Sequence, residues 1–298
     1  MYHRPVLINE SIDGLDIKPD GIYVDATFGG GGHSQIILSE LNKDGILIGI
    51  DQDKESKENL INDNRFKFIH GNFRFIKNYL HYLEIEFVDG VIADLGVSSH
   101  QFDIKDRGFS FRLGGSLDMR MNSTQELKAS EIINNYSEEK LLNVFKDYCD
   151  IENPRKLTTV ITENRKQNSI NRIEDFVEII SGVIPKNKEI KYLAQVFQAL
   201  RIEVNDEINI LSTFLNACPD IIKPKGRLAV ISYHSIEDGL VKNLIRSGNT
   251  SGEIESDLYG TKPSVFKAIN KKIIIPKQSE IDENNRAKSA KLRIAERT

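Results

Sequence analysis

The chain has 298 residues, of which 39% are hydrophobic and 28% charged, proportions that are ordinary for a water-soluble globular protein of one large domain or two smaller ones. It contains no apolar run of about 18 residues, and its opening segment MYHRPVLINE carries an acid, so we expect neither a signal peptide nor a membrane anchor. These features predict a cytoplasmic protein without a membrane partner, and the net charge of -4 argues against indiscriminate nucleic-acid binding.

The first predicted strand, Ile22 to Asp25, runs into four glycines and then into a helix-like segment, Gln35 to Leu41. This order is typical of the first unit of a doubly wound nucleotide-binding fold. Glycines permit a positive φ and let the loop approach a ligand closely. The spacing D-x-T-x-G-x-G from Asp25 favours the loop of S-adenosylmethionine (AdoMet) enzymes, although G-x-G-x-x-S from Gly29 nearly fits the dinucleotide pattern, and a tight turn without ligand is the alternative.

The second predicted strand, Gly45 to Asp51, is apolar and also ends in an acid. An acid at this position of a nucleotide-binding fold accepts hydrogen bonds from the ribose hydroxyls of the ligand. Asp51 is therefore the candidate ribose-binding residue, with a solvated acid at a strand end as the alternative.

Two more strands are predicted, at residues 65–71 and 87–99, with helix-length segments at 54–62 and 72–83 before them. Such alternation predicts a parallel sheet with right-handed crossovers. The next strand begins only at Gly226, about 125 residues later, whereas a crossover needs roughly a dozen. The gap predicts an inserted domain.

The predicted insert is helical. Apolar residues recur at helical spacing in three segments, residues 141–148, 173–180 and 193–200, which we interpret as core-facing stripes. We expect residues 1–101 and 206–298 to form an AdoMet-binding domain, and residues 102–205 to form a helical domain that recognises the substrate.

After the insert, Lys223 to Gly226 is predicted to be a turn before the fifth strand, and residues 246–263 a flexible loop. The segments 265–276 and 290–297 are then expected to pair as antiparallel strands at the sheet edge. The predicted fold class is therefore α/β, with a mostly parallel sheet and an antiparallel edge strand.

Basic residues are concentrated at the C-terminus. Residues 271–298 contain eight basic and four acidic side chains, so this tail carries +4 and the rest of the chain -8. A local basic patch suits a protein that meets one defined RNA site, because phosphate contacts supply affinity and position. A solvated charged terminus is the alternative.

Ligands of open α/β sheets bind beyond the carboxyl ends of the strands. Asp25, Asp51 and Asp94 end predicted strands, and the fifth strand leads into Tyr233 and His234, so all should meet in one crevice. In enzymes that methylate exocyclic amines, a polar side chain at the place of Asp94 accepts a hydrogen bond from the amine and aims its lone pair at the methyl group. Asp94 is the first catalytic candidate, with a cofactor contact as its alternative, and His234 is the second.

Two other chemistries fit the sequence poorly. Ser98 or Ser99 with His234 and an Asp could form a hydrolase triad, but the G-x-S-x-G elbow is missing from the sequence. The six histidines show no paired metal spacing, so no metal is expected.

Eight stretches of the chain resemble the bacterial ribosomal small-subunit RNA methyltransferase H family, and together they span nearly the whole sequence. They are HRPVLINE (3–10), DATFGGGGHS (25–34), GIDQD (49–53), DLGVSSHQFD (94–103), RGFSFR with LDMRM (107–121), FQALRIEVN (197–205), GRLAVISYHSIED (226–238) and RAKSAKLRIAER (286–297).

The resemblance implies AdoMet as methyl donor, a class I methyltransferase fold, Rossmann-like with a helical insert, and methylation of N4 of a cytidine in the decoding region of 16S rRNA within the small ribosomal subunit. Carried over by position, the implied cofactor contacts are Gly31, Gly32, His33, Asp51, Phe73, Asp94 and Gln101. Phe73 suits packing against adenine, and a core phenylalanine is the alternative.

For the substrate side we expect the target cytosine to leave its stack and to meet Phe102, Phe109 or Phe111, with Arg120 and His234 nearby. Residues 193–196 (LAQV) lack the basic side chains typical of the family. Competing functions are a methyltransferase for a protein or small molecule, a non-catalytic RNA-binding factor and, more weakly, a dehydrogenase. A homodimer is compatible with the sequence.

Overall fold

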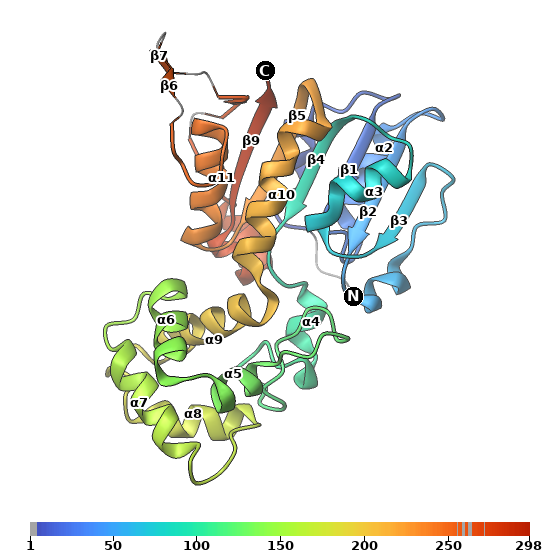
Figure 1. Cartoon of the computed structure of the whole chain (residues 1–298). Coiled ribbons are helices and arrows are strands. Elements are labelled where there is room, and N and C mark those ends of the chain that lie inside the picture. Colours follow the sequence, from blue (N-terminus) through green and yellow to red (C-terminus); the bar gives the residue numbers. More distant parts are fainter. Residues whose placement is uncertain (1–4, 255, 258–259, 262–263, 271) are drawn as a thin grey trace. The chain divides into compact units, whose positions relative to one another are not determined.

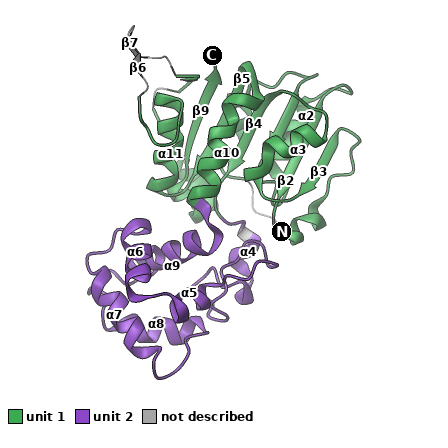
Figure 2. Cartoon of the chain, viewed as in Figure 1, with its two compact units in different colours: residues 1–96, 208–298 green, residues 97–207 purple. Residues whose placement is uncertain are grey.

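The computed structural model describes residues 5–298 except 255, 258–259, 262–263 and 271, and it leaves out the side chains of residues 99, 256–257 and 260–261. It divides the chain into two compact units, residues 1–96 with 208–298, and residues 97–207 (Figure 2). The first unit contains a β-sheet and the second is helical. The second unit therefore starts five residues earlier than the expected insert and ends two residues later.

A seven-stranded sheet in the order β3-β2-β1-β4-β5-β9-β8 forms the centre of the first unit (Figure 1). The strands are β1 (Ile22–Asp25), β2 (Ile46–Asp51), β3 (Phe66–His70), β4 (Val88–Asp94), β5 (Ile222–Ser232), β8 (Phe266–Ala268) and β9 (Lys291–Arg297). The first five are parallel, and β9 pairs antiparallel with both β5 and β8. This confirms the predicted α/β class with a mostly parallel sheet and antiparallel edge strands.

Helices cover both faces of the sheet, because neighbouring strand residues point to opposite sides. Buried Val24 belongs to the apolar core that includes α3, α10 and α11, whereas its neighbour Tyr23 belongs to the core that includes α1 and α2. The helices of this unit are α1 (Ile8–Leu15), α2 (Gly32–Glu40), α3 (Ile76–Tyr82), α10 (Glu207–Ile221), α11 (Ser235–Ser247) and α12 (Gln278–Glu283), with 3-10 turns η1 (Lys54–Asn59), η2 (Phe73–Phe75) and η4 (Asn285–Ser289).

The second unit is helical, as predicted. Its elements are α4 (Ser99–Asp103), η3 (Lys105–Arg107), α5 (Ala129–Asn135), α6 (Glu138–Tyr148), α7 (Pro154–Asn164), α8 (Ile173–Ser181) and α9 (Glu189–Asn205). The three predicted stripes lie on α6, α8 and α9 and meet in one core, where Phe145, Phe176 and Val196 are fully buried. Among the described helices of the chain, none has both the length and the apolar composition needed to cross a bilayer.

Several predicted boundaries are wrong. β4 ends at Asp94 rather than near Ser99, and the segment before β3 forms a 3-10 turn over residues 54–59 instead of a longer helix. β5 starts at Ile222, so the predicted turn lies inside this strand. The pairing with β4 shifts its register there, and Lys225 has φ 66°, so the turn residues produce a bulge rather than an end.

The predicted flexible loop at 246–263 is also wrong in part. Arg246 and Ser247 complete α11, and two short strands, β6 (Ser256–Asp257) and β7 (Gly260–Thr261), pair antiparallel. The remaining residues 255, 258–259 and 262–263 lie outside the described part of the chain. The terminal antiparallel pair is confirmed, although β8 covers only three residues of its predicted segment.

Asp89 lies at the start of β4, at the end of the strands opposite the glycine loop. Its side chain is only 7% exposed. Its carboxylate accepts hydrogen bonds from the Ile22 N–H at 3.0 Å, Lys18 Nζ at 3.3 Å and Lys223 Nζ at 2.8 Å. Burial raises the pKa of Asp89, but the hydrogen bonds from Lys223 and the Ile22 N–H outweigh it and lower the pKa. One acid thereby ties the start of β1, the segment before it and β5 to β4.

We expect Asp89→Asn to lower the free energy of unfolding by about 1–2 kcal/mol at pH 7, because one hydrogen bond to a charged acceptor is lost and the others weaken. Since the pKa of Asp89 is depressed by folding, this stabilisation exists above the unfolded pKa of about 3.9 and disappears as the pH falls through the lower folded value. Urea unfolding at pH 7 and pH 3 measures it.

Asp220→Asn is the matched control, because Asp220 pairs with Lys77 while both side chains are more than half exposed. Its effect should stay below about 0.5 kcal/mol. Equal effects of the two substitutions at pH 7 would contradict the assigned role of Asp89.

Candidate active site

The glycine loop between β1 and α2 is shaped by Asp25. This carboxylate is 2% exposed and accepts hydrogen bonds from the Thr27 N–H at 3.1 Å and from Ser34 Oγ at 2.7 Å. Burial raises the pKa of Asp25 to about 6, while the Ser34 and Thr27 hydrogen bonds oppose the rise. Gly29 and Gly31 adopt positive φ of 49° and 75°, conformations that favour glycine. With both oxygens occupied, Asp25 holds the loop in shape.

Asp51 at the end of β2 faces the same loop. One oxygen accepts from the Gly29 N–H at 2.6 Å and the other from the Asp53 N–H at 2.8 Å. Burial raises the pKa of Asp51 to about 6, and these two hydrogen bonds oppose the rise. A carboxylate has about four lone-pair positions, so each fixed oxygen can accept one more donor. Asp51 can thus accept hydrogen bonds from two further donors, one at each oxygen.

Asp94 ends β4 and is joined to two neighbouring elements. Its N–H donates to Thr27 Oγ1 at 2.7 Å, and its Oδ1 accepts from the Tyr233 hydroxyl at 2.8 Å. Burial raises the pKa of Asp94 to about 6, whereas nearby His33 and the Tyr233 hydrogen bond lower it. The predicted convergence of Asp25, Asp51 and Asp94 is therefore present in the first unit.

His33 follows the glycines at the start of α2 and is 6% exposed. Its ring hydrogen bonds to the Val6 backbone, and burial lowers its pKa, so it is neutral at pH 7. Among the described residues, none offers a hydrogen bond to the buried Nε2. A buried nitrogen of this kind suits a polar group of a bound ligand. Gly32 is required by packing, since a Cβ there would lie 2.1 Å from Pro5 Cγ.

The other candidates have defined structural roles. Phe73 is partly buried, and its ring packs edge-on against Phe214 of α10, with the ring centroids 5.1 Å apart. Part of its surface therefore belongs to the core. His234 caps α11: its Nδ1 accepts from the Glu237 N–H at 3.4 Å, and its Nε2 lies 3.1 Å from Glu237 Oε1. An adenine contact of Phe73 and a catalytic role of His234 stay predictions.

Gln101 belongs to the second unit, apart from the other candidate cofactor residues. It forms a capping box at the start of α4, in which its Oε1 accepts from the Ser98 N–H at 3.0 Å and its own N–H donates to Ser98 Oγ at 3.2 Å. This cap fixes the chain just after the Asp94 strand. Its cofactor contact also stays a prediction.

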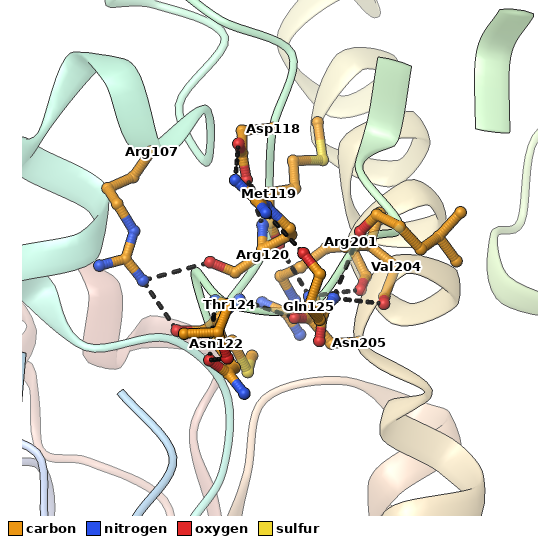
Figure 3. Close-up of polar contacts among 12 residues, drawn as sticks. Arg107, Asp118, Met119, Arg120, Asn122, Thr124, Gln125, Arg201, Val204 and Asn205 are labelled. Atoms are coloured by element: carbon orange, nitrogen blue, oxygen red, sulfur yellow. Dashed lines mark hydrogen bonds and ion pairs between the residues drawn. The ribbon is translucent and has the colours of Figure 1, made fainter. Parts of the chain in front are cut away.

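A braced loop in the second unit contains the LDMRM segment, residues 117–121 (Figure 3). Met119 has φ 62°, a strained conformation for this residue. Asn205 at the end of α9 holds it, because its Oδ1 accepts from the Met121 N–H at 2.7 Å and its Nδ2 donates to the Met119 carbonyl at 2.8 Å. Arg107 Nη2 donates to the Met121 carbonyl at 2.9 Å.

Arg120 is engaged inside this loop. Its guanidinium forms a two-point ion pair with Asp118, with both contacts at 2.8 Å (Figure 3). The predicted substrate contact of Arg120 would require this pair to be shared or opened. Of the predicted stacking residues, Phe109 is 5% exposed and lies in the core, while Phe102 and Phe111 are partly buried and pack against it.

The basic tail is divided between structural and exposed residues. Arg293 makes a two-point contact with Asp238 at 2.7 and 3.1 Å, and Arg297 donates to the Pro219 carbonyl at 3.0 Å. Arg286 and Lys288 on η4 are exposed. Part of the tail's charge therefore fastens β9, and the exposed residues form its outer surface.

The sequence reasoning placed Tyr233 near the site without giving it a role, and it missed Thr27 and Asn205 as braces. Thr27 could have been found, because it sits between Asp25 and the first positive-φ glycine. Tyr233 and Asn205 act across 139 and 84 residues of sequence, and no local pattern announces such pairings.

Comparison with known proteins gives the same assignment. The sequence profile of the MraW methylase family matches residues 1–298. The protein named Ribosomal RNA small subunit methyltransferase H in Bacteroides thetaiotaomicron is 51% identical over 296 residues, covering 99% of this chain and 97% of that protein. The protein of the same name in Christiangramia forsetii is 53% identical over 294 residues, with coverage of 99% and 97%.

A solved structure of an rRNA methylase from Streptococcus thermophilus is 14% identical and aligns with a TM-score of 0.41 over 100% of this chain and 98% of its own. The assignment rests on the full-length sequence matches. The chain belongs to the MraW methylase family, a family of AdoMet-dependent methyltransferases.

Proposed function

We propose that this protein transfers a methyl group from AdoMet to N4 of a cytidine in 16S rRNA of the small ribosomal subunit. The observation that carries the proposal is Asp94, held by Tyr233 and Thr27 at the carboxyl end of β4, beside the loop that Asp25 and Asp51 shape. The relatives that match over their full length are named as methyltransferases of small-subunit rRNA.

The glycine loop and its acids fit AdoMet. Asp51 offers two fixed oxygens to the ribose hydroxyls, and the loop backbone at Gly31 and Gly32 is assigned to the cofactor contact. The buried His33 Nε2 offers a polar partner, and Phe73 is the residue proposed to pack against the adenine. Bound AdoMet supplies an electrophilic methyl group on a sulfonium.

Asp94 is the residue proposed to meet the acceptor amine. An exocyclic amine of cytosine has its lone pair delocalised into the ring, so hydrogen bonds from its N–H groups to acceptors hold it where the lone pair faces the methyl group. The Asp94 carboxylate supplies such an acceptor and is ionised above a pKa of about 6. Positioning of this kind accounts for amine methylation without a nucleophilic side chain.

RNA recognition is assigned to the helical unit and to the exposed part of the tail. The braced loop at residues 117–121 is rigidly held, which favours a defined contact surface, and Arg286 with Lys288 offers phosphate contacts. The cytosine must leave its stack to reach Asp94. A methyltransferase acting on another acceptor, or a binding factor without activity, is the competing function.

The decisive experiment incubates the protein with labelled AdoMet and small subunits from a strain that lacks this gene, beside free 16S rRNA. N4-methylcytidine identified by mass spectrometry would support enzyme, donor and acceptor together. AdoMet binding without incorporation into either RNA would overturn the proposed acceptor.

Asp51→Ala should weaken AdoMet binding roughly 10- to 100-fold, because two hydrogen bonds to a charged acceptor are lost. For the wild-type protein, the raised pKa of Asp51, about 6, predicts weaker binding as the pH falls below 6 and the acceptor becomes protonated. Calorimetric titration at pH 5, 6 and 7.5 measures both effects. Asp44→Ala, at an exposed acid in the turn before β2, is the control and should bind normally.

Asp94→Ala should reduce methyl transfer at least about 100-fold, since the amine loses the acceptor that orients it. Single-turnover rates and AdoMet affinity should be measured on the same preparation, with Asp94→Asn as the isosteric variant. Near-normal transfer by Asp94→Ala with intact AdoMet binding would refute the role.

The double variant Arg286→Ala with Lys291→Ala should bind small subunits more weakly and lower the slope of log affinity against log salt by roughly 1 to 2. Lys43→Ala with Lys67→Ala removes two exposed lysines elsewhere in the first unit and keeps the net charge equal. If both double variants showed the wild-type slope, the tail would not belong to the interface.

A further inference from the structure

Tyr233 makes a direct polar contact with the side chain of Asp94. Its hydroxyl donates to Asp94 Oδ1 at 2.8 Å, and it follows β5, whose Ile231 lies opposite Asp94 in the sheet register. Among the residues that the structure describes, no other side chain donates a hydrogen bond to this carboxylate. Oδ2 is therefore the oxygen left to face an incoming group.

The tyrosine is itself fixed in place. Its N–H donates to Glu237 Oε2 at 2.8 Å, and the same oxygen accepts from the His234 N–H at 3.2 Å, so the cap of α11 anchors the turn that carries the ring. The ring packs against the core formed with α1 and α2. Glu237 is 2% exposed, which leaves this anchor shielded from water.

We propose that Tyr233 is a positioning residue for the methyl transfer: its hydroxyl holds Oδ1 of Asp94 so that Oδ2 is presented to the acceptor amine. The inference rests on the proposed function of Asp94. Tyr233 therefore acts on the methyl transfer through its hydrogen bond to Asp94, and not through direct contact with the substrate.

The charges around Asp94 explain why such a donor matters. Asp25 and Glu237 face the carboxylate as like charges, His33 is neutral at pH 7, and Tyr233 is the neutral donor. Burial and the neighbouring Asp94 raise the pKa of Tyr233 well above its usual value, so the phenol keeps its proton and remains a donor. A hydrogen bond to an ionised carboxylate favours the ionised form.

Tyr233→Phe removes the donor and preserves the ring. We expect the acid limb of the single-turnover rate against pH to move upward by roughly one pH unit, so that the rate at pH 6 falls about fivefold and recovers near pH 8. AdoMet affinity at pH 8 should stay within about twofold. An unmoved acid limb would overturn the proposal.

Tyr136→Phe is the matched control, because the Tyr136 hydroxyl also donates to a carboxylate, Glu203 Oε1, at 2.8 Å. It should leave the acid limb at the wild-type pH. If Tyr233→Phe failed to fold, 3-fluorotyrosine at position 233 would serve, since a more acidic phenol is a stronger donor and should move the limb downward.

A measurement that does not depend on turnover separates the proposed role of Tyr233 from that of Asp94. Carbon-13 labelling of aspartate, with the Asp94 signal assigned through Asp94→Asn, follows the titration of Asp94 in the free protein. A raised titration midpoint in Tyr233→Phe is expected. Near-normal transfer by Asp94→Ala would instead overturn the proposed role of Asp94, whatever Tyr233 does, whereas an unchanged midpoint together with inactive Asp94→Ala would overturn only the role of Tyr233.

Discussion

The desolvation of three carboxylates at the carboxyl ends of β1, β2 and β4, of which Asp25 is buried and Asp51 and Asp94 are half-buried, is the constraint on which the site depends. A buried charge is tolerated only where donors surround it. Here most donors are backbone N–H groups of the glycine loop and its neighbours, at Thr27, Gly29 and Asp53. The loop conformation and the ionisation of the acids are therefore coupled, and the positive φ of Gly29 turns its N–H toward Asp51.

This arrangement has a cost for the protein without ligand. Folding raises the pKa of Asp25, Asp51 and Asp94 to about 6, from an unfolded value near 3.9. Between these two values the folded protein binds more protons than the unfolded chain, so the contribution of these acids to stability falls as the pH rises through this window. At neutral pH they oppose folding, and hydroxyl donors of a nucleoside ligand would offset part of that cost.

In the helical unit, side-chain hydrogen bonds hold an irregular loop rigid. Met119 in the left-handed region costs roughly 1–3 kcal/mol. Asn205 offsets this cost with three hydrogen bonds. Its side-chain oxygen accepts from the Met121 N–H, and its side-chain nitrogen donates to the carbonyls of Met119 and Arg201. Because Asn205 ends α9, a helix packed in the core, the loop inherits the rigidity of that core. A recognition surface built this way loses little entropy when a partner binds.

Features that depend on local sequence patterns could be predicted, whereas features that depend on contacts between residues distant in sequence could not. Periodicity and strand-end acids were sufficient for the parallel order, the inserted helical unit and the position of Asp25, Asp51 and Asp94 around the glycine loop, because these depend on local patterns and on one rule of sheet topology. The predicted start of β5 was wrong because the turn residues form a bulge within the strand, where Lys223 pairs with Asp89, 134 residues away in sequence. The ion pair of Arg120 with Asp118 could not be predicted, because a guanidinium held by an acid has the same sequence signature as a free one. Side-chain hydrogen bonds between separate elements produce no periodic pattern in the sequence. The hydrogen bond from Tyr233 to Asp94 is one of them.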